Sequence, residues 1–245
     1  MRVVFLGATK GMGRALARRM AERKDELFLL GRNLQDLEAS AADLKIRGGH
    51  ERVNVGVCDL EDSDRFAPAL EAARAAMGDV DAVVITAGLF AVQEKLESDL
   101  DLTRRLLTVN FTHTLLFCEH ARRMLLARGG GTLCVFSSVA GERGRRPVAI
   151  YGASKAGLSR YLEALDHRHR AEGLKVVCVH PGFVRTGMTD GLKPPPFAGE
   201  PDEVAHIVLR AIDRGTPLVY APRMWALVML VIRWLPRFVM RRVGF

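Results

Sequence analysis

The sequence predicts an α/β fold of the Rossmann type: a single domain whose doubly wound parallel sheet has about seven strands and carries helices on both faces. Short apolar runs alternate with longer amphipathic stretches, which is typical of a parallel sheet wrapped by helices. The short runs are apolar almost throughout, as strands covered on both faces must be. A glycine-rich turn follows the first run, where such folds bind a nucleotide.

The expected elements can be placed along the 245 residues, a length that suits one undivided α/β domain. The predicted strands are Arg2–Leu6, Glu26–Leu30, Arg52–Val57, Ala82–Thr86, Gly131–Ser137, Lys175–His180 and Pro217–Tyr220. The predicted helices are Gly13–Arg23, Leu34–Arg47, Ser63–Met77, Leu100–Arg128, Ala153–Glu172 and Pro201–Arg214. We expect a dinucleotide-binding catalytic domain over residues 1–222 and a basic amphipathic tail over residues 223–245. The proline-rich stretch 193–197 is interpreted as a loop.

The positive charge of the chain is concentrated in this tail. The sequence has 36 Lys and Arg against 28 Asp and Glu, a formal net charge of +8. Residues 223–245 contain five arginines and no acid, so the rest of the chain is nearly neutral. Proteins that bind nucleic acid by neutralising phosphates carry a basic stripe on the folded body. The composition therefore argues against a nucleic-acid partner.

The cysteines and the apolar runs indicate where the protein works. Four widely spaced cysteines lie in or beside apolar runs: Cys58, Cys118, Cys134 and Cys178. This pattern is typical of buried free thiols and predicts no metal site, so we expect a reducing, cytoplasmic compartment. The apolar start Arg2–Ala8 is too short for a secretory signal. The longest apolar run, Met224–Ile232, has nine residues and is too short to span a membrane.

The glycine-rich segment Gly7-Ala8-Thr9-Lys10-Gly11-Met12-Gly13 joins the first strand to the first helix. Glycines here permit a tight turn and let backbone N–H groups approach a pyrophosphate at the helix N-terminus. The alternative is a merely structural turn. The position directly after the first strand favours a dinucleotide ligand.

The end of the second strand selects between the two nicotinamide dinucleotides. NAD-binding folds usually place an acid there, on the adenosine ribose, but this chain has Gly31-Arg32-Asn33. The planar, permanently charged guanidinium of Arg32 suits a 2′-phosphate, and Lys10 offers a second charge to the same group. These residues predict NADP(H), unless both are simply solvated surface charges.

Tyr151 and Lys155 stand four residues apart, on one face of the helix expected around them. The pKa of a tyrosine is about 10, and a neighbouring ammonium favours the phenolate. We therefore expect Lys155 to lower the pKa of Tyr151, so that this pair exchanges a proton with a substrate oxygen. The spacing alone is common on helix surfaces.

Further landmarks accompany this pair at the ends of the predicted strands. They are the glycine turn, Asp59-Leu60, Ala87-Gly88, Ser137-Ser138 and Pro181-Gly182. With them, the sequence resembles the short-chain dehydrogenase/reductase family over approximately residues 1–220. The resemblance implies that Tyr151 is the acid/base, that Ser138 hydrogen-bonds the substrate oxygen and that Lys155 holds the nicotinamide ribose. Asn110 matches the asparagine that supports a proton-relay water, and the spacing favours Ser138 over Ser137.

The same resemblance implies a set of cofactor-binding residues. Those of the glycine turn bind the phosphates, Asp59 and Leu60 contact the adenine, and Ala87 and Gly88 lie beside the adenosine ribose. Pro181, Gly182 and Thr186 match the loop that orients the nicotinamide amide. The expected set is Gly7, Thr9, Lys10, Gly11, Met12, Gly13, Arg32, Asp59, Leu60, Ala87, Gly88, Tyr151, Lys155, Pro181, Gly182 and Thr186.

Two positions depart from the family pattern. Leu6 stands where the family usually has a threonine before its first glycine, and Thr86 stands where it has an asparagine after the fourth strand. Thr86 keeps a hydroxyl but loses the amide that normally braces the centre of the sheet. These changes affect local bracing and leave the catalytic set complete.

The expected activity is reduction of a ketone by hydride from NADPH, or oxidation of the corresponding secondary alcohol, with Tyr151 as acid/base and Ser138 stabilising the oxygen. A catalytically silent nucleotide-binding or scaffold protein is the alternative, and the complete catalytic set argues against it. Sugar epimerisation, known in a related extended family, normally needs a larger C-terminal domain. We expect a homodimer or homotetramer formed through the helices that carry Asn110 and Tyr151.

The tail 223–245 has two interpretations. As one helix it would gather Arg223, Arg233, Arg237 and Arg241 in a narrow stripe, with tryptophans and aliphatic residues around the rest. That pattern slightly favours peripheral contact with the membrane surface, although docking on its own domain or a second subunit is nearly as well supported. Pro236 is expected to kink or split the helix.

The substrate is expected to be small and hydrophobic or lipid-like, on two grounds. The first is the tail, and the second is the loop Glu142–Pro147 between Ser138 and Tyr151, where Arg145 or Arg146 offers a charge to an anionic group. The alternative for these arginines is a solvated loop. His180, before Pro181, is expected to be a hydrogen-bonded structural residue.

Overall fold

A computed structural model of the chain, which describes residues 1–195 and 197–242, contains a seven-stranded parallel sheet in the order β3-β2-β1-β4-β5-β6-β7. The strands are β1 (Arg2–Leu6), β2 (Glu26–Gly31), β3 (Val53–Val57), β4 (Ala82–Ile85), β5 (Gly131–Phe136), β6 (Leu174–Pro181) and β7 (Leu218–Ala221). All seven strands were predicted, and the order reverses between β1 and β4. In a doubly wound sheet a ligand binds at such a reversal, outside the carboxyl ends of the strands.

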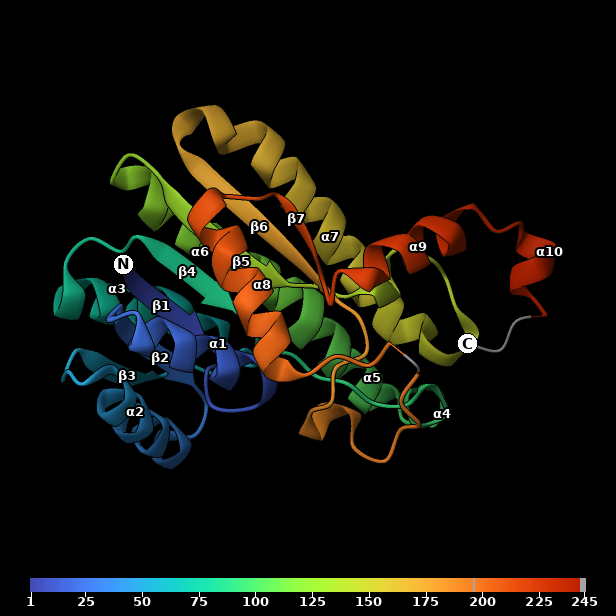
Figure 1. Cartoon of the computed structure of the whole chain (residues 1–245), viewed down its shortest axis with the longest axis horizontal. Helices are drawn as coiled ribbons and strands as arrows, with labels where there is room; N and C mark the ends of the chain where they lie inside the picture. Colours follow the sequence, from blue (N-terminus) through green and yellow to red (C-terminus); the bar gives the residue numbers. More distant parts are fainter. Residues whose placement is uncertain (196, 243–245) are drawn as a thin grey trace.

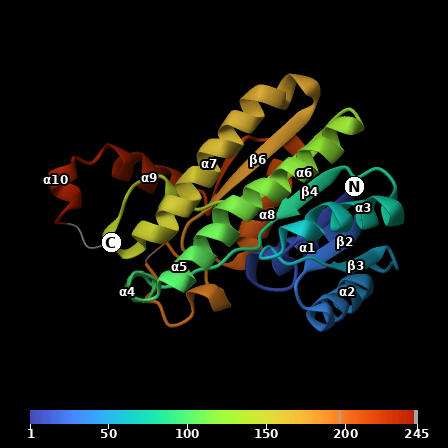
Figure 2. The ribbon, with the colours of Figure 1, turned by 180° about the vertical axis from the view of Figure 1, so that it is seen from behind.

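Helices cover both faces of the sheet (Figures 1 and 2). They are α1 (Gly11–Glu22), α2 (Leu34–Gly48), α3 (Phe66–Met77), α4 (Gln93–Ser98), α5 (Leu100–Leu107), α6 (Thr114–Ala127), α7 (Ala149–His169), α8 (Pro201–Arg214), α9 (Met224–Trp234) and α10 (Arg237–Met240). One apolar core lies between the sheet and α1, α2 and α8, and a second between the sheet and α3, α6 and α7. The prediction that both faces of the sheet are covered is therefore confirmed. Packing on both faces holds the ends of the strands in place.

The helix boundaries differ from the prediction in ways that affect the site. Helix α4 was missed, and α7 begins at Ala149 rather than Ala153, so that Tyr151 lies in its first turn. The single helix expected over Leu100–Arg128 is interrupted between α5 and α6 by a π-helical turn, Thr108–His113. The periodicity cannot show one extra residue in a turn, because the apolar positions on either side keep the helical spacing.

The tail forms two short helices beyond the carboxyl end of β7, at one end of the molecule (Figure 1). Pro236 separates α9 from α10, as predicted. The single arginine stripe was wrong, because Leu235 and Pro236 are extended and break the helical register. Of the tail, residues 243–245 lie outside the described residues, as does Pro196 of the predicted loop. Within the described residues, no helix has the length and apolar character to cross a membrane.

The docked face of α9 packs on the catalytic domain. Trp225, Met229 and Ile232 are buried and form a small core with Val139, the residue after Ser138. The opposite face stays open to solvent, and Trp234 is 81% exposed. The tail therefore docks on its own domain and still presents an apolar surface.

Candidate active site

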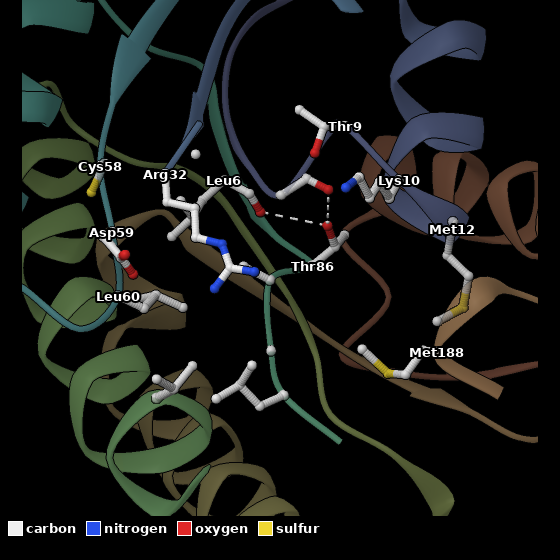
Figure 3. A pocket seen from close by; sticks show the side chains of 18 of the residues that line it. Leu6, Thr9, Lys10, Met12, Arg32, Cys58, Asp59, Leu60, Thr86 and Met188 are labelled. Carbon is white, nitrogen blue, oxygen red and sulfur yellow. Dashed lines mark hydrogen bonds between the residues drawn. The ribbon is translucent and has the colours of Figure 1, made fainter. Parts of the chain in front are cut away.

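A cavity of about 350 Å³ lies at the reversal of strand order, outside the carboxyl ends of β1, β2 and β4. Twelve expected cofactor residues line it: Gly7, Thr9, Lys10, Gly11, Met12, Gly13, Arg32, Asp59, Leu60, Ala87, Gly88 and Thr186. Figure 3 shows Arg32, Asp59 and Leu60 on one side of this cavity and Lys10, Met12 and Met188 on the other. The structure thus brings together segments that are far apart in the sequence.

Close backbone packing explains two of the glycines. A Cβ on Gly13 would lie 2.1 Å from the carbonyl oxygen of Gly7, and a Cβ on Gly7 would lie 2.6 Å from the backbone nitrogen of Ala87. The hydroxyl of Thr86 donates a hydrogen bond of 2.9 Å to the same Gly7 oxygen (Figure 3). Thr86 thus ties the glycine turn to β4. The first N–H groups of α1, which no intrahelical carbonyl accepts, stay free at the cavity for a diphosphate.

The two cations expected near an adenosine phosphate, Lys10 and Arg32, differ in whether they are already paired with an acidic side chain. Lys10 pairs with Asp36 at 3.3 Å, and both side chains are largely exposed. Among the described residues, no ion pair or side-chain hydrogen bond involves Arg32, which is exposed at the end of β2. Asp59 accepts a hydrogen bond from the backbone of Glu61 at 3.0 Å. Arg32 is therefore the available cation on this side, and Lys10 reaches an anion only by leaving Asp36.

Asn110 sits within the π turn and is completely buried. Its amide donates to the carbonyl oxygen of Leu89 and its oxygen accepts from the Leu89 N–H, both at 2.7 Å. Thr114 donates to the Val109 carbonyl from five residues further along the chain. Asn110 therefore holds the segment after β4 against the π turn. Such π-helical turns are frequent at functional sites.

Tyr151, Ser138 and Lys155 come together from α7 and the end of β5. The Lys155 ammonium lies 5.9 Å from the centre of the Tyr151 ring and donates a 3.0 Å hydrogen bond to the carbonyl of Phe136. Phe90 packs edge-on against the tyrosine ring, with centroids 5.2 Å apart. The hydroxyl of Ser138 accepts from the backbone of Ala140 at 3.1 Å, which orients it. The ring and the serine are thus held by neighbours rather than free to rotate.

The protonation of this group differs from the sequence expectation. Burial raises the pKa of Tyr151 to about 12, and hydrogen bonding by Ser138 offsets this in part. Burial also lowers the pKa of Lys155 to about 8. The expected net lowering of the tyrosine pKa by the lysine was therefore wrong, because desolvation outweighs a charge at this distance. At neutral pH Tyr151 is a protonated phenol, ready to donate a proton.

Gly88 lies between the cavity and two of the residues predicted to be catalytic, Asn110 and Lys155, which do not themselves line the cavity. A Cβ placed on Gly88 would lie 3.2 Å from the Asn110 side-chain oxygen and 3.7 Å from the Lys155 nitrogen. Asn110, Ser138 and Lys155 are buried behind it. Gly88 is therefore a point where a dinucleotide lying in the cavity would come close to Lys155.

The expected nicotinamide loop is only partly at the cavity. Thr186 lines the cavity, with its methyl group 3.3 Å from a Cβ placed on Gly11. Gly182 instead packs under Trp225 of α9: a Cβ there would lie 2.1 Å from the indole nitrogen. Pro181 ends β6 and is paired with Ala221 of β7. Sequence reasoning missed the contact of Trp225 with Gly182, since no local pattern links residues so far apart.

The serines and the arginine loop were also clarified. Ser137 donates to the backbone carbonyl of Lys155 at 3.0 Å, so it is structural, and Ser138 is the serine next to the tyrosine. His180 is hydrogen-bonded and buried, as predicted. Arg146 is exposed, but the Nε of Arg145 is buried with no hydrogen-bond partner among the described residues. Arg145 is therefore only partly solvated, and Arg146 fits the solvated alternative.

The chain is similar to known oxidoreductases. A family profile described as short chain dehydrogenase matches residues 1–195. Over 243 residues the chain is 32% identical to an uncharacterised oxidoreductase of Mycobacterium tuberculosis, which covers 98% of this chain and 96% of the relative. It is 32% identical over 219 residues to the 3-oxoacyl-(acyl-carrier-protein) reductase of Homo sapiens, with 84% and 89% covered.

One solved structure shows the likeness in three dimensions. A crystal structure of a variant actinorhodin polyketide ketoreductase with NADPH superposes with a TM-score of 0.80 at 24% identity, covering 89% of this chain and 95% of that one. At this identity the likeness concerns the fold. The mycobacterial alignment covers so much of the chain that it extends into the tail.

Proposed function

Because the chain belongs to the short-chain dehydrogenase/reductase family, we propose that it reduces a ketone to a secondary alcohol with NADPH and catalyses the reverse oxidation. The observation that carries the proposal is the grouping of Tyr151 with Ser138 and Lys155, whose ammonium lies next to Gly88 of the cavity. A phenol and a hydroxyl that reach one oxygen can protonate and stabilise it while the adjoining carbon accepts hydride.

The proton chemistry follows from the state of each side chain. NADPH, when bound, supplies the hydride. Tyr151, protonated at neutral pH, donates its proton to the developing alkoxide, which is the stronger base, and Ser138 donates a hydrogen bond to the same oxygen. The Lys155 ammonium favours the resulting phenolate. By resemblance to the family, Asn110 supports a proton-relay water near Lys155, and two hydrogen bonds to Leu89 hold its side chain in place.

The preference for NADPH rests on Arg32. No acid stands at the end of β2, and the guanidinium of Arg32 lines the cavity without an ionic partner among the described residues. A planar guanidinium binds a phosphate with two parallel hydrogen bonds. Lys10 contributes a weaker share, since it has to leave Asp36.

The proposed substrate is a hydrophobic, lipid-like ketone that carries an anionic group. Met188 and Phe197, in the segment after β6, expose 46% and 47% of their surface. Arg145 lies in the loop between Ser138 and Tyr151, and its buried Nε has no hydrogen-bond partner among the described residues. Burial lowers the pKa of this arginine, and the nearby charge of Glu142 offsets that effect only in part. An acidic group on the substrate supplies a further anion and an acceptor for this Nε.

Such a substrate is best met at a membrane, and the tail supports peripheral contact with anionic lipid at the cytoplasmic surface. The side of α9 and α10 that faces away from the domain exposes Leu227, Val231, Trp234 and Phe238. The five tail arginines have no acidic neighbour within the tail sequence. Apolar side chains flanked by arginines, with tryptophan at the boundary, are typical of interfacial helices.

Assembly into a homodimer or homotetramer stays a prediction. By resemblance to the family it would use α6 and α7, which follow Asn110 and carry Tyr151. Sedimentation of the purified protein tests it directly.

Ketone reduction is tested with a panel of neutral and acidic ketones, including lipid ketones in detergent, with NADPH and NADH in parallel. We expect loss of nicotinamide absorbance for at least one acidic lipid ketone, with NADPH preferred. Replacing Tyr151 by Phe removes only the acid, so the rate should fall by about 10²- to 10⁴-fold. NADPH binding, followed by fluorescence, should be retained.

Two outcomes would count against the proposal. A Tyr151→Phe variant with normal turnover would remove the tyrosine from the mechanism. Tight NADPH binding by the wild-type protein without turnover of any ketone or alcohol would favour the alternative, a catalytically silent nucleotide-binding or scaffold protein. Normal turnover of neutral ketones, with none of acidic ones, would remove only the role given to Arg145.

A further inference from the structure

Glu142 is a buried carboxylate in the loop between Ser138 and Tyr151, and its side chain is only 4% exposed. Its Oε1 lies 2.9 Å from Nδ1 of His180, on β6. Its Oε2 accepts a hydrogen bond of 3.1 Å from the hydroxyl of Tyr220, on β7, and lies 3.5 Å from Nε of Arg233, on α9. Arg145 adds a further positive charge nearby. One carboxylate thus joins the catalytic loop to two strands and the tail.

The chain of contacts continues from His180 into the catalytic helix. Nε2 of His180 lies 3.0 Å from the hydroxyl of Ser159, which lies 2.7 Å from the hydroxyl of Ser137. Both serine hydroxyls reach the backbone carbonyl of Lys155, at 2.9 Å and 3.0 Å. A continuous buried path therefore leads from Arg233 of α9 to the backbone of Lys155.

The order of groups Glu142, His180 and Ser159 resembles that of a hydrolytic triad, but the surroundings exclude that chemistry. His180 is 3% exposed and Ser159 is 6% exposed. A substrate carbonyl has no access to a serine enclosed in this way. The group is therefore a structural connection, and every member is hydrogen-bonded, as buried polar groups need to be.

Helix α9 is also fastened to both loops that border the site. Arg143, next to Glu142, donates a 2.7 Å hydrogen bond to the carbonyl of Leu235 at the end of α9. At the other end, the indole of Trp225 covers Gly182 and donates to the carbonyl of Phe197 at 3.2 Å. The loop between Ser138 and Tyr151 and the segment after β6 therefore both contact α9, so a shift of α9 would disturb both.

We propose that Glu142 is a positioning residue that transmits the docking of α9, through His180 and Ser159, to Lys155. The proposal rests on the proposed function for the role of Lys155 in catalysis. Neither Glu142 nor His180 contacts the cavity, so both act through the catalytic residues. Docking of the tail then sets the rate of reduction without adding a group to the reacting centre.

A Glu142→Gln variant removes the negative charge that faces His180 and Arg233. Its amide nitrogen only donates, so the contact with His180 is kept only if Nδ1 of the imidazole becomes the acceptor, and the oxygen left for Tyr220 and Arg233 is uncharged. If half of the free energy of one hydrogen bond to a charged group is lost from the stabilisation of the transition state, the rate falls by about tenfold. Arg233→Gln keeps the carboxylate and removes only the tail contact, so a smaller loss follows.

The test compares Glu142→Gln and Arg233→Gln with Arg237→Gln, a control on the same tail that makes no contact with Glu142. We expect kcat for ketone reduction to fall in the first two, with Glu142→Gln the lower, while KM and the dissociation constant for NADPH stay within about twofold. Arg237→Gln should match the wild type. A lower melting temperature with unchanged kcat in both variants would overturn the proposal, because it would show a stabilising role only.

A second measurement does not depend on turnover. The ¹³Cε resonance of Lys155, assigned as the line missing from a Lys155→Arg variant, reports the surroundings of the ammonium. It should move in Glu142→Gln and Arg233→Gln and stay in place in Arg237→Gln. An unmoved resonance in all three would overturn the positioning role even if the wild type proved inactive, and inactivity with a moved resonance would refute only the proposed function. Arg233→Gln alters a partly exposed side chain, so it keeps the test valid if Glu142→Gln does not fold.

Discussion

The two sides of the active site are built in different ways. The cofactor side is lined mainly by short segments that each directly follow a strand of the sheet, among them the glycine turn 7–13, Arg32 and Gly88. The substrate side is assembled from four distant segments that meet around Glu142: the loop after β5, β6, β7 and α9. A substitution within the glycine turn is poorly tolerated because its backbone is closely packed. The group around Glu142 depends instead on whether α9 stays docked.

This contrast predicts where a single substitution has the largest effect on stability. Trp225→Ala removes a side chain that is 8% exposed and covers Gly182, so we expect a loss of about 3–5 kcal/mol in the free energy of unfolding, or separate release of α9. Denaturant melts and limited proteolysis of the tail measure the two outcomes.

The matched control is Trp234→Ala, on the same helix. Trp234 is 81% exposed, and exposed substitutions usually change stability by less than about 0.5 kcal/mol. Equal destabilisation by both variants would mean that α9 does not dock as described.

On the cofactor side, Arg32 and Lys10 make a matched pair of cations. Arg32→Gln should raise KM for NADPH about tenfold or more and leave KM for NADH unchanged, since only NADPH carries the 2′-phosphate. Lys10→Gln should have a smaller effect, because Lys10 is already paired with Asp36. Initial rates at varied cofactor concentration measure both, and a wild-type preference for NADH would contradict the role of Arg32.

The pH dependence of reduction should report Lys155 rather than Tyr151. Burial lowers the pKa of Lys155 to about 8, so its charge is present below that pH and lost above it. Tyr151, with its pKa raised to about 12 by burial, stays protonated across this range. We therefore expect kcat/KM for reduction, which reports groups of the free enzyme, to fall as pH rises through about 8. The Lys155→Arg enzyme should be slower, but its guanidinium stays charged, so the decline with pH should disappear. A decline that persisted in this variant would mean that another group causes it.

The smallest effect on the isolated enzyme is expected from the exposed face of the tail. Replacing Trp234 and Phe238 by Ser should leave kcat and melting temperature unchanged in solution but abolish flotation with vesicles that contain phosphatidylglycerol. Binding should weaken with added salt, since arginines contribute through screened electrostatic attraction. Ile46→Ser, at another exposed apolar position, is the control. Equal flotation of all variants, or binding to neutral vesicles alone, would refute the membrane contact.

Much of the fold could be predicted because its signals are local. Strands covered on both faces appear as unbroken aliphatic runs, and the doubly wound order follows from alternation with helices. Twelve of the residues predicted to bind the cofactor line one cavity, since most of them directly follow strand ends or belong to the glycine turn; their contact with a cofactor stays a prediction. The missed helix α4 is short and lacks a long periodic stretch to reveal it.

The parts that escaped prediction depend on distance and burial. The direction of the Tyr151 pKa shift was wrong because spacing in sequence shows a neighbouring lysine but not the loss of solvent around the ring. The π turn at Asn110 needed one extra residue in a turn, which leaves no mark on the apolar pattern. For Arg145, sequence alone could not separate a solvated charge from a buried one.

By itself the sequence determined the parallel sheet and the glycine turn, and it predicted the side chains proposed for proton transfer, because each of these signals lies within a short stretch of chain or at a strand end. Tertiary structure decided the rest. Only folding brings Arg233 to Glu142 and Trp225 to Gly182, and only burial fixes which groups are charged. Both are long-range effects: they depend on which distant segments exclude water together.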